Sequence, residues 1–192
     1  RLSLAAANQQ GTFLEVWLGN GDGTFQPPLM TAITFHSDLV VADLNDDDQP
    51  DLVFVSNQNP GTISVLLGNG DGSFRPAVDY FAGYAPIAIA VDDFNRGHKH
   101  DLAIAGQYIT VMLGAENGAY PKPAQYSIGL NLGPLAAGRF TGRFKDLGKL
   151  DLAVINDTSI SILLGGGGAT FKLGSTYPIG TYPTDVVGGA VS

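Results

Sequence analysis

Oxygen-bearing side chains alternate in one short acidic segment, which runs from Asp43 to Asp51 and reads Asp-Leu-Asn-Asp-Asp-Asp-Gln-Pro-Asp. Asp or Asn occupies positions 1, 3, 5 and 9 of this loop. Calcium binds six to eight oxygens at about 2.3 to 2.6 Å, and alternate residues of a tight loop can point inward together. The spacing therefore predicts a calcium site. Its expected side-chain ligands are Asp43, Asn45, Asp47 and Asp51, with the Gln49 carbonyl as a fifth ligand and water completing the shell.

The acidic loop has two other interpretations, a solvated acidic turn and an EF-hand. A solvated acidic turn has the same composition. An EF-hand also begins Asp-x-Asn-x-Asp, but it requires a glutamate at position 12, where Phe54 stands, and it requires flanking helices. The residues after Asp51 are Leu, Val, Phe and Val, which is typical of a strand, so the EF-hand is excluded.

The same slot recurs twice further along the chain with fewer ligands. The second loop keeps the side chains of positions 1, 3 and 9 as Asp93, Asn95 and Asp101, but Gly97 stands at position 5. We expect this loop to be a weaker calcium site. The third slot begins Arg-Phe-Thr-Gly at residue 139, so calcium is not expected there, and a basic side chain can take the place of the cation beside Asp151.

One local cluster resembles a catalytic site, namely Asp92 and Asp93 with the basic group His98, Lys99 and His100. Adjacent residues of a strand point to opposite faces, so the two carboxylates are not expected to act together. The three histidines of the chain, at 36, 98 and 100, lie in no nucleophile motif. The sequence therefore predicts no catalytic residues, and we expect a protein that is not an enzyme.

The loops belong to an internal repeat. The segment Val16–Phe25 returns as Val65–Phe74, and weaker copies end at Tyr120 and Phe171. The Leu-Gly pairs of these copies lie 49, 46 and 51 residues apart, and an Asp-Leu marker recurs every 50 residues at positions 51, 101 and 151. Two markers in phase indicate four copies of one structural unit.

Each unit of nearly 50 residues holds about four short apolar stretches bounded by Gly, Asn, Asp or Pro, such as residues 87–91, 102–105 and 109–113. We interpret these stretches as strands and the Gly-Asn-Gly-Asp-Gly segments as hairpin turns. The prediction is an all-β single domain over residues 1–192, a β-propeller of about four four-stranded blades.

The two ends of the chain align with neighbouring parts of the repeat, residues 4–8 with 53–57 and residues 183–192 with 86–95. A final strand at residues 186–191 would then complete the blade begun by the N-terminus. A closed four-blade ring, a slice of a larger ring, and a homodimer sharing eight blades all fit this phase.

Composition narrows the class of partner. The chain has 18 acidic and 10 basic residues, which disfavours nucleic acid as a partner. No apolar run reaches the eighteen or so residues of a spanning helix, so membrane insertion is not expected. Cysteine is absent, which excludes disulfides and thiolate metal sites.

The acidic loop joined to the Leu-Gly-Asn-Gly-Asp-Gly hairpin resembles the FG-GAP repeat (VCBS type), which the integrin α-subunit propeller and many bacterial surface proteins carry. The resemblance covers essentially the whole chain. It implies a propeller with calcium in the loop between the first two strands of some blades, and a secreted or cell-surface location. Asp48 stands at loop position 6, where the family usually has glycine.

The resemblance favours an adhesion or binding module that recognises a protein or carbohydrate partner and uses Ca2+ as a structural cofactor. A lectin-like propeller is the first alternative, and the propeller of a polysaccharide-active enzyme is the second. In the lectin interpretation, aromatic side chains stack on sugars; otherwise they pack between blades. The aromatic residues concerned are Trp17, Tyr80, Tyr84, Tyr108, Tyr120, Tyr126, Tyr177 and Tyr182.

Overall fold

The fold of the chain is all-β. A computed structural model describes residues 3–7, 13–33, 37–127, 132–140, 149–181, 183–186 and 188, and these form four antiparallel sheets. Within these ranges the single helical element is a 3₁₀ turn, η1 (Glu116–Gly118). None of the described segments forms a helix long and apolar enough to cross a membrane.

The strands follow one another in sequence order within each sheet. The first sheet consists of β1 (Leu4–Ala7), β2 (Phe13–Trp17) and β3 (Leu29–Ala32). The second consists of β4 (Asp38–Ala42), β5 (Asp51–Ser56), β6 (Gly61–Leu66) and β7 (Val78–Gly83). The third consists of β8 (Ala88–Asp92), β9 (Asp101–Ala105), β10 (Ile109–Met112) and β11 (Pro123–Tyr126). The fourth consists of β12 (Leu132–Gly138), β13 (Asp151–Asn156), β14 (Ser159–Gly167) and β15 (Thr170–Pro178).

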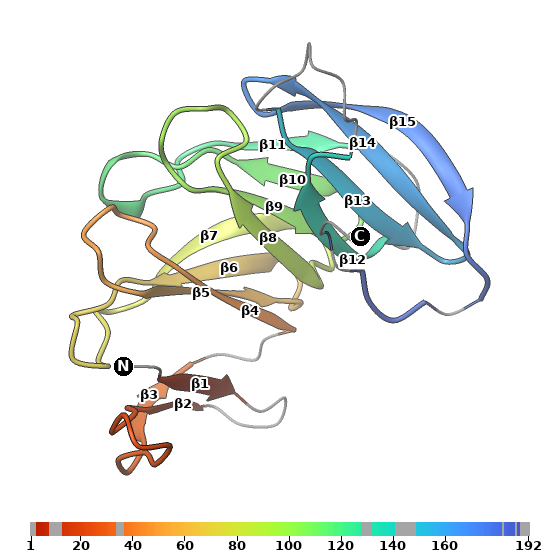
Figure 1. The fold of residues 1–192 in the computed structure, drawn as a ribbon. Coiled ribbons are helices and arrows are strands. Elements are labelled where there is room, and N and C mark those ends of the chain that lie inside the picture. The colour runs from red at the N-terminus through yellow and green to blue at the C-terminus, as the bar shows by residue number, and fades with distance from the viewer. Residues whose placement is uncertain are drawn as a thin grey trace.

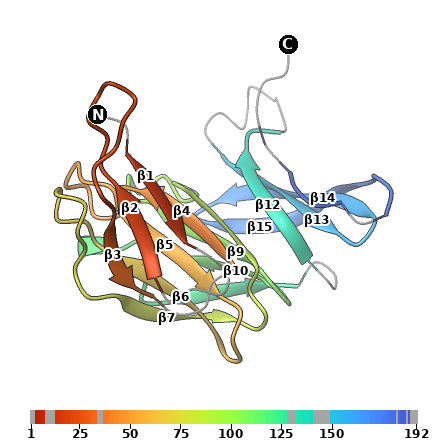
Figure 2. The same cartoon turned by 90° about the horizontal axis from the view of Figure 1, so that it is seen from below.

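The four sheets succeed one another along an arc, with the first and fourth at its two ends (Figures 1 and 2). The first strands of neighbouring sheets lie side by side, β4 with β8 and β8 with β12. The amide of Ile89 in β8 donates to the Asp38 carboxylate of β4 at 3.0 Å, so a hydrogen bond also joins two sheets here. The strands predicted near residues 87, 102 and 109 are confirmed as β8, β9 and β10.

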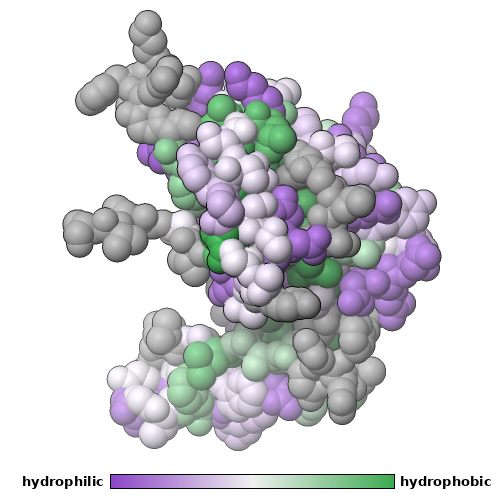
Figure 3. All heavy atoms as spheres, turned by 90° about the vertical axis from the view of Figure 1, so that its right-hand side faces the viewer, coloured by the Kyte–Doolittle hydropathy of each residue, from purple (hydrophilic) through white to green (hydrophobic). Residues whose placement is uncertain are grey.

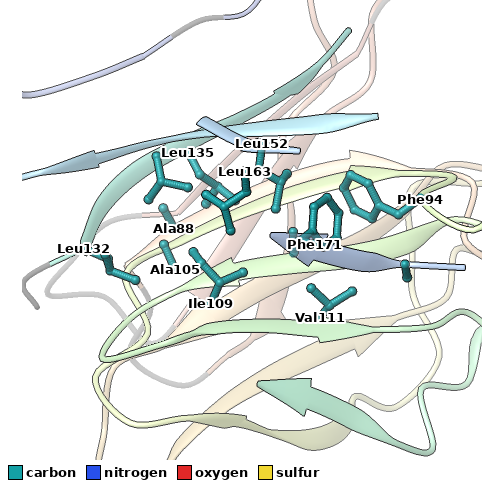
Figure 4. Close-up of a cluster of buried hydrophobic side chains, with 13 residues drawn as sticks. Ala88, Phe94, Ala105, Ile109, Val111, Leu132, Leu135, Leu152, Leu163 and Phe171 are labelled. Carbon is teal, nitrogen blue, oxygen red and sulfur yellow. The ribbon is translucent and has the colours of Figure 1, made fainter. Parts of the chain in front are cut away.

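The core consists of three apolar layers, one between each pair of successive sheets. Alternate residues of one strand serve different layers, since Val53 faces the third sheet while Leu52 faces the first. Every residue of β5 and β9 is therefore buried, which explains why these strands are almost continuously apolar. Figure 4 shows the layer between the third and fourth sheets, where Phe94 and Phe171 lie next to each other.

A buried aspartate at the start of the second strand braces three of the four sheets. Asp51 accepts hydrogen bonds from the amide of Leu44, in the loop before the strand, at 2.8 Å and from the amide of Gly68, after the third strand, at 2.7 Å. Asp101 and Asp151 bind the corresponding amides, those of Phe94 with Gly114 and of Phe140 with Gly165, at 2.9 to 3.1 Å. All three carboxylates are at most 2% exposed. Each carboxylate therefore ties together two turns that are separate in sequence.

Close backbone packing explains why glycine follows the third strand of each unit. A β-carbon added at Gly68 would overlap the carbonyl oxygen of Pro50, the residue before Asp51. The same overlap with backbone oxygens would occur at Gly114 and Gly165. The Asp-Leu marker and the Leu-Gly marker thus recur in phase because the aspartate and the glycine form one contact.

The first sheet departs from the pattern in two ways. It has three strands, and the sequence alignment of residues 4–8 with 53–57 was wrong by one position. Leu4 pairs with Trp17 as Leu52 pairs with Leu66, so Ser3 stands at the position of Asp51. The Ser3 hydroxyl accepts a long hydrogen bond, 3.5 Å, from the Gly19 amide.

The final strand predicted at residues 186–191 lies mostly outside the described residues. Residues 183–186 and 188 belong to no strand. A β-carbon at Gly188 would approach the carbonyl oxygen of Ala137 in β12, so this residue lies beside the fourth sheet. In the described part of the chain, β1 has no strand on its free edge.

We predict that Gly68→Ala lowers the free energy of unfolding by at least about 2 kcal/mol, because the added methyl group meets backbone that cannot move aside. The measurement is chemical denaturation. Gly23→Ala is the control, since nothing lies within 4 Å of its added β-carbon and the cost is about 1 kcal/mol of backbone strain at φ +91°. Equal losses at the two positions would contradict the packing argument.

We also predict that Asp151→Asn destabilises the protein by about 1 to 3 kcal/mol, because the new amide group faces a buried backbone N–H and cannot accept from it. Asp22→Asn is the matched control. Asp22 lies in an exposed turn and accepts from Thr24, which asparagine can also do, so this change should stay within about 0.5 kcal/mol. The free energy of unfolding is measured by denaturation, and Asp151→Asn should lower it equally with chelator present. An unchanged free energy of unfolding in this variant would contradict the role of Asp151 in the brace.

Candidate metal centre

The first acidic loop joins β4 to β5, and its side chains converge on its own backbone amides. Asp43 accepts from the amides of Asp47 at 3.1 Å and Asp48 at 2.8 Å. The Asn45 side-chain oxygen also accepts from the Asp47 amide at 3.1 Å. The side-chain oxygens of Asp43 and Asn45 therefore meet at one point in the loop, as the alternating pattern predicts.

The Asp47 side chain completes this cluster. One of its oxygens accepts from the Gln49 amide and the other accepts from the Asn45 side-chain amide, both at 2.9 Å. The Gln49 side chain lies against Gly70 in the following hairpin. Asp43, Asn45 and Asp47 thus lie together, with Asp47 more exposed to solvent than the other two.

Asp51 lies deeper than the other predicted ligands, since it is fully buried. Burial raises the pKa of its carboxyl group above the ordinary value, and the charges of Asp47 and Asp43 act in the same direction, while the bonds from Gly68 and Leu44 oppose them. The structure assigns this residue to the brace. Each carboxylate oxygen can accept a second interaction, so metal ligation by Asp51 stays a prediction.

The second loop, between β8 and β9, has the same backbone shape. Asp93 accepts from the amides of Gly97 at 3.0 Å and His98 at 2.9 Å, as Asp43 does from the equivalent amides. Loop positions 4 and 6 have positive φ in both loops, at Asp46, Asp48, Arg96 and His98. Asp48 therefore occupies a left-handed backbone position, which glycine adopts most easily.

The donor sets of the two loops differ. Gly97 supplies no carboxylate, and the buried side-chain oxygen of Asn95 has no hydrogen-bond partner, whereas the equivalent oxygen of Asn45 has one. The Asn95 side-chain amide instead points to Asp101 at 3.4 Å. Burial raises the pKa of Asp101, against the bonds from Gly114, Asn95 and Phe94. Asp93, Asn95 and Asp101 are thus brought together, but the second loop has fewer oxygen donors.

A lysine connects the two loops across the sheets, which the sequence did not indicate. The Lys99 ammonium lies 2.7 Å from an Asp46 oxygen and 3.6 Å from a Glu116 oxygen. The hydrogen bond from Lys99 lowers the pKa of Asp46. Lys99 pairs with Asp46, and Asp93 accepts from backbone amides, so these two members of the cluster considered for catalysis make structural contacts.

The remaining predicted site residues have other surroundings. Asp92 accepts from the next amide in the chain, that of Asp93. His36 and residues 141–148, which include Arg143 and Lys145 as two candidates for the basic group expected beside Asp151, lie outside the described residues. Asp151 itself accepts from Phe140 and Gly165 as described above.

The oxygens of the first loop fit a hard cation in kind, although they hold amides in this structure. Among the described residues, no three Asp, Glu or His side chains are arranged to hold a metal ion. The donor set of carboxylate and amide oxygens is nevertheless the one calcium prefers. The residues that would hold it are Asp43, Asn45 and Asp47, with Asp51 below them.

No protein-family model matches the chain, and no curated protein matches its sequence.

We predict a pH dependence that isolates Asp101. Because burial raises its pKa, the folded chain binds this proton more tightly than the unfolded chain, for which the pKa is about 3.9. The stability of the wild type relative to Asp101→Asn should therefore be greatest below about pH 4 and fall as the pH rises through the folded-state pKa. Denaturation in chelator at several pH values measures this difference. A difference that grows with pH would mean that the amide bonds outweigh burial.

Proposed function

We propose that this chain is a calcium-stabilised binding module of the FG-GAP (VCBS-type) β-propeller kind, which recognises a protein or carbohydrate partner in a secreted or cell-surface protein. The observation that carries the proposal is the convergence of Asp43 and Asn45 on the amide of Asp47, within a loop that the chain repeats at Asp93. The succession of four sheets, with their first strands side by side, supports the propeller arrangement.

Calcium in this proposal has a structural role. When bound, the ion would offset the repulsion among the loop carboxylates and link loop positions 1, 3 and 5. The residues do the rest: the Asp43 bonds hold the turn closed, and Lys99 ties the turn to the third sheet. The loop carboxylates are thereby occupied, which leaves them no acid–base role.

Several aromatic side chains considered for sugar stacking are used for packing instead. Tyr80 and Tyr120 contact each other edge to face between the second and third sheets, and Tyr126 contacts Phe171 between the third and fourth. Tyr120 is 1% exposed. These contacts weaken the lectin alternative, so we favour a partner that docks on the loops over a sugar held between sheets. Tyr182 lies outside the described residues.

The loops that would receive a partner gather at one end of the sheets. The acidic loop of the second sheet lies against its own hairpin, since the Gln49 side chain covers Gly70. The hairpin carries Asp71, whose pKa is lowered by its hydrogen bonds to Ser73. A partner docking here meets negative charge, which bound calcium would partly neutralise. This arrangement favours calcium-dependent recognition.

The test is thermal unfolding with calcium and with chelator. At one hundred times its dissociation constant, calcium bound to the folded state alone adds about 2.7 kcal/mol per site. We expect the wild type to melt several degrees higher with calcium, and we expect Asp43→Ala to lose this difference.

Asp93→Ala is the matched control, because it removes the same two amide bonds from the loop with the poorer donor set. Both variants should be less stable in chelator, but Asp93→Ala should keep most of the calcium response. If calcium moves the midpoint of neither the wild type nor this control, the calcium proposal is wrong.

A further inference from the structure

An aromatic contact recurs between successive sheets. Six residues after the glycine of each turn stands an aromatic side chain; these are Phe25, Phe74, Tyr120 and Phe171. Tyr120 packs edge to face on Tyr80 of the preceding sheet, with ring centres 5.9 Å apart. Phe171 packs in the same way on Tyr126 at 6.0 Å and on Phe94 at 5.7 Å. In these two layers, the later sheet inserts a ring against a tyrosine of the earlier one.

The strand register places a third tyrosine at the position where Tyr80 and Tyr126 receive a ring of the next sheet. Tyr80 pairs with Ile63 and Tyr126 pairs with Ile109, at equivalent positions of their sheets. Tyr177 pairs with Ile160 at the same position of the fourth sheet. It is 55% exposed, because no described sheet follows the fourth.

Phe140 is a second partly exposed ring on the fourth sheet. Its amide donates to Asp151 as the amide of Phe94 donates to Asp101, so the two phenylalanines are equivalent. Phe94 is 3% exposed under Phe171, whereas Phe140 is 39% exposed. In the layer between the third and fourth sheets, Phe94 and Tyr126 pack on Phe171. The fourth sheet carries the equivalent pair of rings, Phe140 and Tyr177, on its outer face.

The first sheet presents the matching incoming ring. Phe25 is equivalent to Phe171 and Tyr120, yet it is 40% exposed. On the same outer face, Leu4 stands at the position of Leu52 and Trp17 at that of Leu66. Leu52 and Leu66 are buried against the preceding sheet, but Leu4 is 49% exposed.

The receiving face contains a cavity of about 690 Å³, lined by Phe140, Ile162, Leu164 and Tyr177 and edged by Lys149 and Lys172. Figure 3 looks onto this side of the molecule and shows hydrophobic and hydrophilic side chains close together. Glu15 lies on the outer face of the first sheet, beside Ala6. The receiving face thus combines apolar side chains with Lys149 and Lys172, and the outer face of the first sheet carries the carboxylate of Glu15 on its middle strand.

The two end faces of one chain do not meet. Both cartoon views place the first and fourth sheets at opposite ends of the arc (Figures 1 and 2). Hydrogen bonds and ion pairs between sheets, such as Ile89 to Asp38 and Lys99 to Asp46, oppose a change of curvature that would bring them together. A second copy of the chain, related to the first by a two-fold axis, would cover both end faces at once. The first sheet of each copy would then pack on the fourth sheet of the other.

We propose that the outer face of the fourth sheet binds the outer face of the first sheet in a second copy of this chain, with Phe25 of one copy inserted between Phe140 and Tyr177 of the other. The pair forms a closed ring of eight sheets. The inference rests on the sheet packing of the proposed propeller and is independent of calcium, so the dimer is expected in chelator as well.

The first test is the mass of the chain in solution by sedimentation equilibrium. We expect twice the chain mass of 20.0 kDa at micromolar concentration. Tyr177→Asp and Phe25→Asp should each raise the dimer dissociation constant at least about 100-fold, since each places a charge in an apolar contact. Tyr84→Asp is the matched control, because Tyr84 is 50% exposed but lies on neither end face, and it should leave the dimer intact. A wild type that is monomeric at every concentration overturns the proposal.

The second test is chemical cross-linking, which does not depend on weakening the dimer. Because the chain has no cysteine, Phe25→Cys and Tyr177→Cys each introduce a single thiol. A short bismaleimide should link two chains when the two variants are mixed, and should link neither variant to itself. A link within a single chain of the double variant would show a four-sheet ring and overturn the proposal. A calcium-independent melting curve with the cross-link present would refute the metal site alone.

Discussion

The buried aspartate brace is the interaction on which the sheets depend. In each of the second, third and fourth sheets, one carboxylate receives the amide of the loop before its strand and the amide of the glycine after the next strand. A buried carboxylate without such donors would be costly, and a buried backbone amide without an acceptor would be costly as well. The brace gives both backbone amides an acceptor and offsets part of the cost of burying the carboxylate. It also requires the glycine, because the two backbone segments come closer than a side chain at that position allows.

The first aspartate of the acidic loop explains how this loop keeps its shape while its oxygen donors change. In the second and third sheets the turn is closed by an aspartate that binds two amides, and positions 4 and 6 are left-handed whether they carry Asp, Arg or His. The backbone amide of position 5 closes the turn but its side chain is not needed for this, so the residue can be Asp47 in one loop and Gly97 in the next. The backbone therefore presents the same loop twice, and the oxygen donors at positions 3 and 5 decide how well each loop suits a cation.

The stacking of sheets explains where the surface is incomplete. Each middle sheet buries one face on its predecessor and the other on its successor, with an aromatic ring from the later sheet filling a place on the earlier one. The end sheets carry the same residues without the neighbour. Tyr120 is buried because a neighbouring sheet covers it. The end faces lack such a neighbour, which leaves four aromatic residues partly or largely exposed, namely Trp17, Phe25, Phe140 and Tyr177. The exposed rings of Phe25, Phe140 and Tyr177 stand at positions whose equivalents pack between sheets elsewhere in the chain.

The sequence alone determined the repeat, the strands between residues 87 and 113, the hairpin turns and the grouping of Asp43, Asn45 and Asp47. All of these follow from local spacing: alternation places side chains on faces, and turn residues with glycine end the strands. Only the tertiary structure decided that Asp51 braces two turns, that Ser3 takes its place in the first sheet, and that Lys99 reaches Asp46. These contacts join residues 17 to 53 positions apart, or depend on a one-residue register, and neither is encoded in local composition. The acidic loop was visible in the sequence because its oxygen-bearing side chains are neighbours, whereas the brace beneath it could be seen only in the fold.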